Sequence, residues 1–310
     1  MNWNPESDFL PDNLKHGAVT IGNFDGVHLG HAQILHRLKA HGLPIVIFTF
    51  ATHPRQILCQ ETAPEQLTLN ERKEYLLRSL GADEVIFAPT QKILNWTAEE
   101  FFRNVIIDFL DAQVIVEGAN FAFGKKRSGN TALLREFCEN SGRKLEIIHD
   151  LLEFDGASVS SSRIRKHISR GEIREANALL TAPYQLEGNV IHGLARGRTM
   201  GFPTANLGGI QTIIPAHGVY ACRARLQDGA SYPAAVHIGP NLTFHETENK
   251  VEIFLLHFSG NIYSQCLKID FLEKLRDLAD FHDSKKLMEQ IQCDIRETER
   301  VFDEFSMNFN

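Results

Sequence analysis

The chain has 310 residues, of which 43% are hydrophobic and 23% charged, a composition typical of a globular protein with room for two domains. A formal net charge of -7 argues against a non-specific nucleic-acid binder. Five cysteines, an odd number without metal-type spacing, favour a reducing compartment. The N-terminus does not resemble a signal peptide, and no apolar run is long enough to span a bilayer, so we expect a cytoplasmic protein without a membrane partner.

In the first half of the chain, short apolar runs that predict strands alternate with amphipathic stretches that predict helices. The predicted strands are 18–21, 43–50, 85–87, 114–116 and 145–148. The predicted helices are 31–41, 69–80, 97–110 and 131–140, the third opened by a capping box of Thr97 and Glu100. This alternation predicts an α/β domain with a parallel sheet covered by helices, in which ligands bind at the carboxyl ends of the strands.

The pattern changes near Tyr184, where short alternating strands separated by turn residues begin. The predicted strands are 184–191, 219–226, 232–238, 251–258 and 262–271, followed by one helix over 283–291. This spacing predicts a small antiparallel β-barrel. We place the boundary between residues 183 and 184, which gives an N-terminal domain of 1–183 and a C-terminal domain of 184–310.

The segment from Gly22 to His31, Gly-Asn-Phe-Asp-Gly-Val-His-Leu-Gly-His, joins the first predicted strand to the first predicted helix. Backbone N–H groups at a helix N-terminus attract anions. Histidines at 28 and 31 lie one turn apart there and add donors for the charge of a phosphate in transfer. Either histidine alone is more simply explained as a surface or capping residue. The three glycines of the segment, which let the backbone approach a ligand, favour the phosphate interpretation.

Two further segments of the first half have features of a nucleotide site. Asn120 and Phe121 follow a predicted strand, where an aromatic ring and an amide can hold a flat ligand ring. The alternative is a loop that packs its phenylalanines into the core. Ser161 and Ser162 lie at a predicted helix start with Arg165 one turn on. These groups suit a triphosphate, although ordinary helix capping is the favoured explanation for either serine alone.

The second half contains one dense motif and one isolated carboxylate. Residues 193–206 read Gly-Leu-Ala-Arg-Gly-Arg-Thr-Met-Gly-Phe-Pro-Thr-Ala-Asn, a loop able to close over phosphates, though glycine spacing alone is also common in β-rich loops. Glu252 is the only ionisable residue of the run Val251–Leu256. Such a strand glutamate often just faces water. Because Phe254 and Leu256 are apolar, its face can instead point toward a pocket.

The Gly22–His31 string resembles the nucleotidyltransferase superfamily, and specifically the FMN adenylyltransferase half of prokaryotic FAD synthetases. The Asn120 and Ser161 segments resemble that family's later motifs, in the same order. The resemblance implies a Rossmann-like parallel sheet in which His28 and His31 stabilise the α-phosphate of ATP. It implies further binding residues: Gly22, Phe24 and Asp25 in the first turn, Asn120 and Phe121 at the flavin, and Ser161, Ser162 and Arg165 at the β- and γ-phosphates.

The Gly-Phe-Pro-Thr-Ala-Asn part of the second motif resembles the signature of riboflavin kinases. That resemblance implies that Thr204 and Asn206 bind Mg²⁺ and ATP phosphates, and that Glu252 accepts the proton of the riboflavin 5′-hydroxyl. Gly193 and Arg198 belong to the phosphate loop, and Arg276 corresponds to a position in a flap over the flavin.

The resemblance runs from Gly17 to Ile295 and departs from the family at three places. Ala51-Thr52 stands where Asp-Pro is usual, Leu242-Thr243-Phe244 where Pro-Thr-Phe is usual, and His257 where an acidic residue is common. The implied enzyme makes FMN and then FAD, with riboflavin, FMN, FAD and ATP as ligands, Mg²⁺ as cofactor and no nucleic acid. The alternatives are a nucleotidyltransferase with another acceptor and a flavin-binding sensor without turnover.

Overall fold

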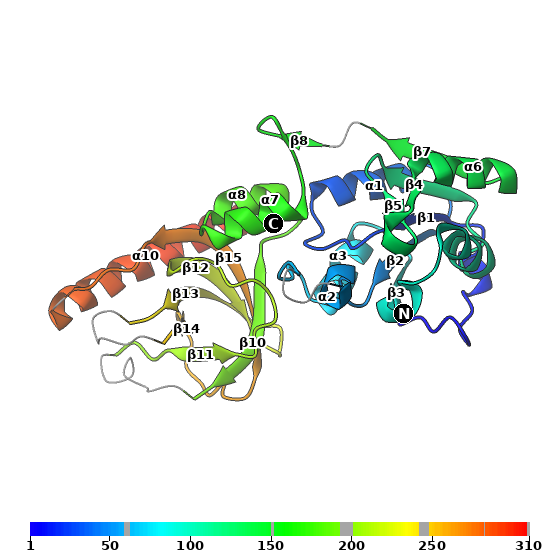
Figure 1. The fold of residues 1–310 in the computed structure, drawn as a ribbon. Coiled ribbons are helices and arrows are strands. Elements are labelled where there is room, and N and C mark those ends of the chain that lie inside the picture. The colour runs from blue at the N-terminus through cyan, green and yellow to red at the C-terminus, as the bar shows by residue number, and fades with distance from the viewer. Residues whose placement is uncertain (59–62, 150–151, 193–200, 242–247, 282, 309–310) are drawn as a thin grey trace. The chain divides into compact units, whose positions relative to one another are not determined.

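The computed structural model describes residues 1–310 except 59–62, 150–151, 193–200, 242–247, 282 and 309–310. The chain divides by its internal contacts into two compact units, Met1–Ser160 and Ser161–Asn310 (Figure 1). The first unit contains a sheet covered by helices, and the second contains a closed barrel. The predicted α/β class with an antiparallel β-barrel is therefore confirmed.

The sheet of the N-terminal unit has five strands among the described residues, in the order β3-β2-β1-β4-β7, and every pairing is parallel. The strands are β1 (Ala18–Ile21), β2 (Ile45–Phe50), β3 (Glu84–Ala88), β4 (Val114–Gly118) and β7 (Lys144–Ile148). Two short hairpins follow the sheet strands: β5 (Ala122–Phe123) with β6 (Gly129–Asn130), and β8 (Glu153–Phe154) with β9 (Ala157–Ser158). All five predicted strands are confirmed, whereas the hairpins were missed because their strands have two residues each.

Helices connect the parallel strands as predicted. They are α1 (Leu29–Lys39), α2 (Pro54–Leu58), α3 (Asn70–Ser79), α4 (Thr90–Ile93), α5 (Ala98–Phe101) and α6 (Thr131–Ser141), with 3-10 turns η1 (Asp12–Leu14) and η4 (Lys125–Arg127). Helix α5 begins at the predicted capping box, in which Glu100 N donates to Thr97 Oγ1 at 3.1 Å and Thr97 N donates to Glu100 Oε2 at 2.8 Å. It continues as a π-helix, η3 (Phe102–Phe109), that the sequence pattern does not distinguish from an α-helix.

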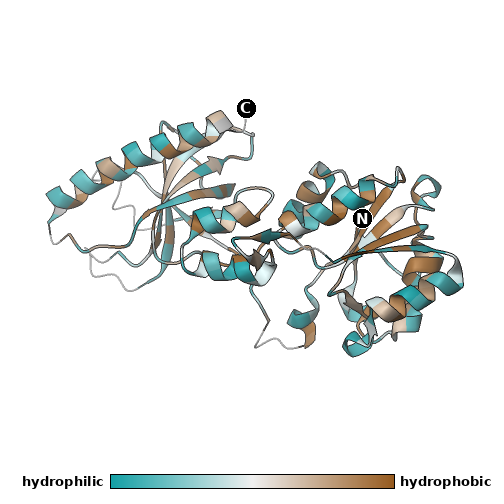
Figure 2. Ribbon diagram, turned by 90° about the horizontal axis from the view of Figure 1, so that it is seen from above, coloured by the Kyte–Doolittle hydropathy of each residue, from teal (hydrophilic) through white to brown (hydrophobic). Residues whose placement is uncertain are grey.

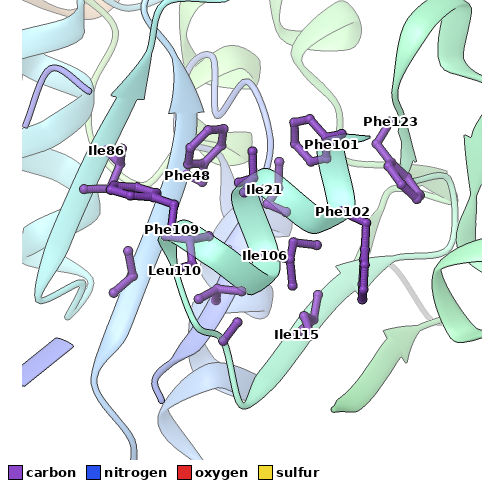
Figure 3. Packing of buried hydrophobic residues seen from close by; sticks show 14 of the residues in the cluster. Ile21, Phe48, Ile86, Phe101, Phe102, Ile106, Phe109, Leu110, Ile115 and Phe123 are labelled. Atoms are coloured by element: carbon purple, nitrogen blue, oxygen red, sulfur yellow. The ribbon is translucent and has the colours of Figure 1, made fainter. Parts of the chain in front are cut away.

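The core of the N-terminal unit lies between this helix and the sheet. Figure 3 shows Phe101, Ile106 and Phe109 directed toward side chains of the sheet, among them Phe48 and Ile115. Phe48, Ile106 and Ile115 are completely buried. Apolar side chains on the strands and on one face of the helix therefore hold the carboxyl ends of the strands in place.

The barrel of the C-terminal unit closes in the order β10-β11-β14-β13-β12-β15, with six strands in the described part of the chain. They are β10 (Gln185–Ile191), β11 (Ala205–Gly208), β12 (Gly218–Arg225), β13 (Ser231–Gly239), β14 (Lys250–Leu255) and β15 (Cys266–Arg276), all antiparallel. Four predicted strands match within a few residues. The last runs five residues further than 262–271, and β11 was missed because it is short.

Three helices accompany the barrel in the described residues: α7 (Ser161–Ser169), α8 (Ile173–Leu179) and α10 (Ser284–Asn308). The prediction that the last helix ends at 291 was wrong. The helix continues because Val301, Phe302 and Phe305 extend its apolar stripe onto Leu272 and neighbouring residues, which Figure 2 shows as alternating hydrophilic and hydrophobic segments. Helices α7 and α8 group with the barrel by contacts, and the functional boundary at 183/184 stays a prediction.

Candidate functional site

The turn between β1 and α1 has an unusual backbone. Phe24, Gly26 and Val27 have φ angles of 48°, 87° and 43°, values that are costly for a β-branched residue such as Val27 and that persist only when the surroundings enforce them. A Cβ added to Gly30 would lie 3.2 Å from the His28 ring, and one added to Gly22 would lie 3.2 Å from the Phe24 ring. The glycines therefore allow aromatic rings to pack directly against the turn.

His28 and His31 form a stacked pair at the N-terminus of α1. Their ring centroids are 3.6 Å apart with an interplanar angle of 15°. His28 is the N-cap residue, and its backbone N–H donates to Nδ1 of His31 at 3.2 Å. This bond makes Nδ1 of His31 an acceptor, so the ring proton is on Nε2, where it can be donated to a ligand. Among the described residues, Nδ1 of His28 is enclosed and has no hydrogen-bond partner.

Burial keeps both imidazoles neutral at pH 7. It lowers the pKa of His28 from 6.5 to about 4 and lowers the pKa of His31 well below its ordinary value, with the charges of His28 and Lys73 acting in the same direction. At pH 7 the pair therefore offers oriented N–H dipoles at the positive end of the helix, without a permanent charge of its own.

Asp25 and Phe24 support the turn. The Asp25 carboxylate is 5% exposed and accepts the N–H groups of Leu67 at 3.0 Å and Thr68 at 3.1 Å, which ties the segment before α3 to the turn. Phe24 is buried, and its ring centroid lies 4.9 Å from that of His31. The contacts with a nucleotide that the sequence implies for Gly22, Phe24 and Asp25 stay predictions.

Two buried ionisable residues near the turn were not predicted as part of the site. Lys73 on α3 is 6% exposed. Glu117 at the end of β4 is 2% exposed and accepts the Ile21 N–H at 2.6 Å; burial raises its pKa well above the ordinary value. Each has a signal in the sequence, because Lys73 shares an i, i+3, i+4 face with Leu76 and Leu77, and Glu117 ends an apolar strand.

Asn120 and Phe121 lie at the same edge of the sheet as the histidine turn. Strands β1 and β4 are parallel neighbours, with Val19 opposite Ile115, so the residues that follow both strands emerge together. Asn120 is exposed. Phe121 is half-buried and stacks on Phe123, with centroids 5.5 Å apart. This placement fits both alternatives, ligand binding and core packing, and the flavin contact stays a prediction.

Ser161, Ser162 and Arg165 lie in the first turns of α7, as predicted. The carbonyl oxygen of Val159, two residues before this helix, is 3.7 Å from the position of a Cβ on Gly30. Val159, which belongs to the N-terminal unit, therefore lies beside the histidine turn. That these three residues bind the β- and γ-phosphates stays a prediction.

In the barrel, strand register brings together residues that lie far apart in the sequence. Asn206 on β11 is opposite Glu252 on β14, and Glu252 is also opposite His237 on β13. His237 Nδ1 lies 3.8 Å from Glu252 Oε2, and both side chains are about one quarter exposed, at 26% and 25%. Thr204 precedes Asn206 by two residues, immediately before β11 begins. His237 was not predicted, because only the strand register places it beside Glu252.

The remaining predicted residues of the C-terminal site divide into two groups. Gly193 and Arg198 lie outside the described residues, as does the Leu242-Thr243-Phe244 departure. Arg276 is at the end of β15, where its Nε and Nη2 donate to the buried Asp294 of α10 at 2.8–3.1 Å. In this structure Arg276 therefore fastens α10 to the barrel, and its contact with the flavin stays a prediction.

The oxygen donors of Thr204, Asn206 and Glu252 fit Mg²⁺. This ion prefers oxygen ligands and usually takes one or two from the protein and the rest from phosphates and water. Across the described ranges no group of three or more His, Cys, Asp and Glu side chains is arranged to hold a metal. A site of this kind therefore depends on a nucleotide to complete the coordination.

The N-terminal unit has a parallel sheet with paired imidazoles at the start of a helix, and the barrel has a carboxylate beside an amide. Together these features define an enzyme that binds nucleotide phosphates in two separate domains. Two family models match the chain, FAD synthetase over residues 10–163 and riboflavin kinase over residues 180–302. The chain belongs to the bifunctional riboflavin kinase/FMN adenylyltransferase family.

Individual relatives support this assignment along nearly the whole chain. A bifunctional riboflavin kinase/FMN adenylyltransferase of Haemophilus influenzae is 34% identical over 296 residues, covering 93% of this chain and 95% of that protein. The protein of the same description from Bacillus subtilis is 33% identical over 294 residues, which cover 92% of this chain and 92% of that protein. A crystal structure described as a macrolide-efflux protein from Streptococcus pneumoniae has a TM-score of 0.83 and 30% identity, covering 96% of this chain and 97% of that one. In the described part of this chain, no helix combines the length and apolar character needed to cross a membrane.

Proposed function

We propose that the C-terminal barrel phosphorylates riboflavin with ATP to give FMN, and that the N-terminal domain joins FMN to the adenylyl group of ATP to give FAD and pyrophosphate. The family assignment supports both activities. The observation that carries the assignment of adenylyl transfer to the N-terminal domain is the stacked pair His28 and His31 at the start of α1.

In the N-terminal site, a phosphate oxygen of FMN attacks the α-phosphorus of ATP. The bond from that phosphorus to the bridging oxygen breaks, and its electron pair leaves with pyrophosphate. Neither step needs a protein nucleophile, so the work of the site is positioning and charge stabilisation. Nε2–H of His31 and the backbone N–H groups at the N-terminus of α1 supply donors toward the α-phosphate. Magnesium, when bound with the nucleotide, neutralises part of the phosphate charge.

In the C-terminal site, Glu252 accepts the proton of the riboflavin 5′-hydroxyl as the oxygen attacks the γ-phosphorus of ATP. Asn206 lies directly opposite Glu252 in the sheet, so the phosphates that it holds with Thr204 are adjacent to the carboxylate. His237, 3.8 Å from Glu252 on the other side, restricts the orientation of the carboxylate. Support for these roles comes from the strand register, in which Asn206 of β11 and His237 of β13 are both opposite Glu252 of β14.

The direct test is a time course. The purified chain is incubated with riboflavin, ATP and Mg²⁺, and the flavins are separated by chromatography. The proposal requires that FMN appears first and FAD afterwards, with pyrophosphate released in proportion to FAD. A second incubation with FMN in place of riboflavin must give FAD directly. Absence of either product from a folded preparation contradicts the corresponding half of the proposal.

The finer expectations belong to the same proposal. They are the boundary at 183/184, a requirement for Mg²⁺, a cytoplasmic location and the absence of a nucleic-acid partner. Omission of Mg²⁺ from the time course tests the requirement for this ion. Limited proteolysis followed by assay of the two fragments tests the boundary, because cleavage near residues 183 and 184 should separate the two activities.

A further inference from the structure

Lys73 is a lysine in an unusual position. It is on the face of α3 that packs toward β3, together with Leu76 and Leu77, and it is 6% exposed. Its Nζ lies 6.0 Å from the centre of the Phe87 ring. A buried lysine is rare because removal of the ammonium group from water is costly unless a partner compensates for it.

Apart from the face of the Phe87 ring, no compensating partner of the ammonium is present in the described part of the chain. The Lys73 ammonium has no hydrogen bond and no ion pair there. The nearest acidic influence is Asp25, whose charge favours the protonated lysine, but its carboxylate already accepts the backbone N–H groups of Leu67 and Thr68. The desolvation of this buried cation is therefore not offset by a hydrogen-bonded anion of the protein in the described residues.

The Lys73 ammonium acts on the histidine turn, which the bonds from the Leu67 and Thr68 N–H groups to the Asp25 carboxylate join to the segment just before α3. Its positive charge is one of the influences that lower the pKa of His31, and Asp25, which acts on Lys73, belongs to the same turn as His28. The side chain of His28 is 7% exposed, and its Nδ1 also lacks a partner among the described residues. Two buried polar side chains without bonded partners thus accompany the tip of α1.

Because both imidazoles are neutral at pH 7, Lys73 is the one group of this cluster able to supply a full positive charge. We propose that Lys73 is a catalytic residue of the N-terminal site, whose ammonium binds a phosphate oxygen of the nucleotide beside His28 and His31. This inference rests on the proposed adenylyl transfer. Lys73 neither gains nor loses a proton in that reaction: it stabilises negative charge as the bond between the α-phosphorus and the bridging oxygen breaks and its electron pair passes to pyrophosphate.

The test compares Lys73→Met with the wild type and with Lys92→Met, a matched control at a lysine 49% exposed on the same unit. The kcat and KM for FAD formation from FMN are measured, with riboflavin kinase activity of the same chain as the control for folding. We expect kcat for FAD formation to fall about 100-fold in Lys73→Met, with kinase activity unchanged. The wild type is assayed first, and if it forms no FAD, the proposed function fails. If the wild type forms FAD and Lys73→Met forms it at the same rate, this inference fails while the proposed function stands.

A second readout separates binding of phosphate from a structural role. Methionine fills a similar volume without the charge, so Lys73→Met should unfold at an equal or higher temperature than the wild type. A variant that loses both stability and activity would show that Lys73 supports the fold, and would overturn the proposal.

A pH profile provides a third readout that does not depend on removal of the side chain's charge. Burial lowers the pKa of Lys73 from 10.5 to about 8, and Asp25 partly offsets this effect. The titratable groups that act on it are Asp25 in the turn and His31 of α1, and on β3 it faces the Phe87 ring. The wild-type kcat/KM for ATP should therefore decline above about pH 8, and Lys73→Arg should move that decline to higher pH, because arginine keeps its charge. An unchanged alkaline limb in an active Lys73→Arg variant contradicts the proposal.

Discussion

The buried imidazole of His28 makes the N-terminal unit sensitive to acid. Its pKa is about 4 in the folded chain and 6.5 when exposed, so between these values the unfolded chain binds a proton that the folded chain does not. With respect to His28, the free energy of unfolding is therefore highest above pH 6.5, and it decreases as the pH falls toward 4. From these two values, the loss between pH 7 and pH 5 is about 2 kcal/mol for His28 alone.

The perturbation that isolates this effect is His28→Asn. Asparagine is a favourable N-cap residue, so the start of α1 is retained while the titrating group is removed. The free energy of unfolding should then decrease by about 2 kcal/mol less between pH 7 and pH 5 than it does in the wild type. His36→Asn is the matched control, because His36 is exposed on the same helix, and its pH dependence should equal that of the wild type.

The assay exploits the distribution of tryptophan. The chain has two tryptophans, Trp3 and Trp96, and both are in the N-terminal unit with ring centroids 6.3 Å apart. Urea titration followed by tryptophan fluorescence therefore reports the unfolding of this unit without a tryptophan signal from the barrel. If wild type and His28→Asn lose the same stability between pH 7 and pH 5, the inference that the folded turn holds His28 neutral is refuted.

Three other substitutions test single contacts. Glu252→Gln should lower riboflavin kinase activity at least 100-fold while FAD formation from supplied FMN is unchanged, which product chromatography measures. Gly30→Ala places a methyl group 3.2 Å from the His28 ring and should lower FAD formation about tenfold with kinase activity intact; an unaffected rate shows that the ring position is not critical. Asp294→Ala leaves the Arg276 guanidinium without its buried partner and should destabilise the barrel by about 3 kcal/mol in thermal unfolding, and an unchanged midpoint would contradict the role assigned to this pair.

The parallel sheet and the histidine turn could be predicted because their signals are local. An apolar run, a glycine-rich turn and an amphipathic stretch follow one another from Ala18 to Lys39, and each element forms where its pattern predicts. The barrel was also predictable as a class, because alternating strands separated by turn residues recur at short intervals. Periodicity did not predict the end of α10, where polar residues interrupt the apolar stripe before Val301, Phe302 and Phe305 resume it.

The parts of the site that were missed depend on contacts distant in the sequence. His237 is beside Glu252 only because β13 and β14 pair in one register, and a shift of one residue would place it on the opposite face. Lys73 resembles any solvated lysine of a helix until the packing of α3 shows it to be buried. Glu117 gains its role from β1, where the Ile21 N–H donates to it. Sequence patterns therefore identified the element that carries each of these residues but not the side-chain environment.

The most direct test of the account is the double substitution His28→Asn with His31→Asn in an otherwise intact chain supplied with riboflavin, ATP and Mg²⁺. Because the proposed function assigns the stacked imidazoles to the N-terminal reaction alone, FMN should form at the wild-type rate and FAD should fall below detection. Continued formation of FAD at the wild-type rate would contradict the assignment of adenylyl transfer to the tip of α1, and so would loss of FMN formation in a variant that remains folded.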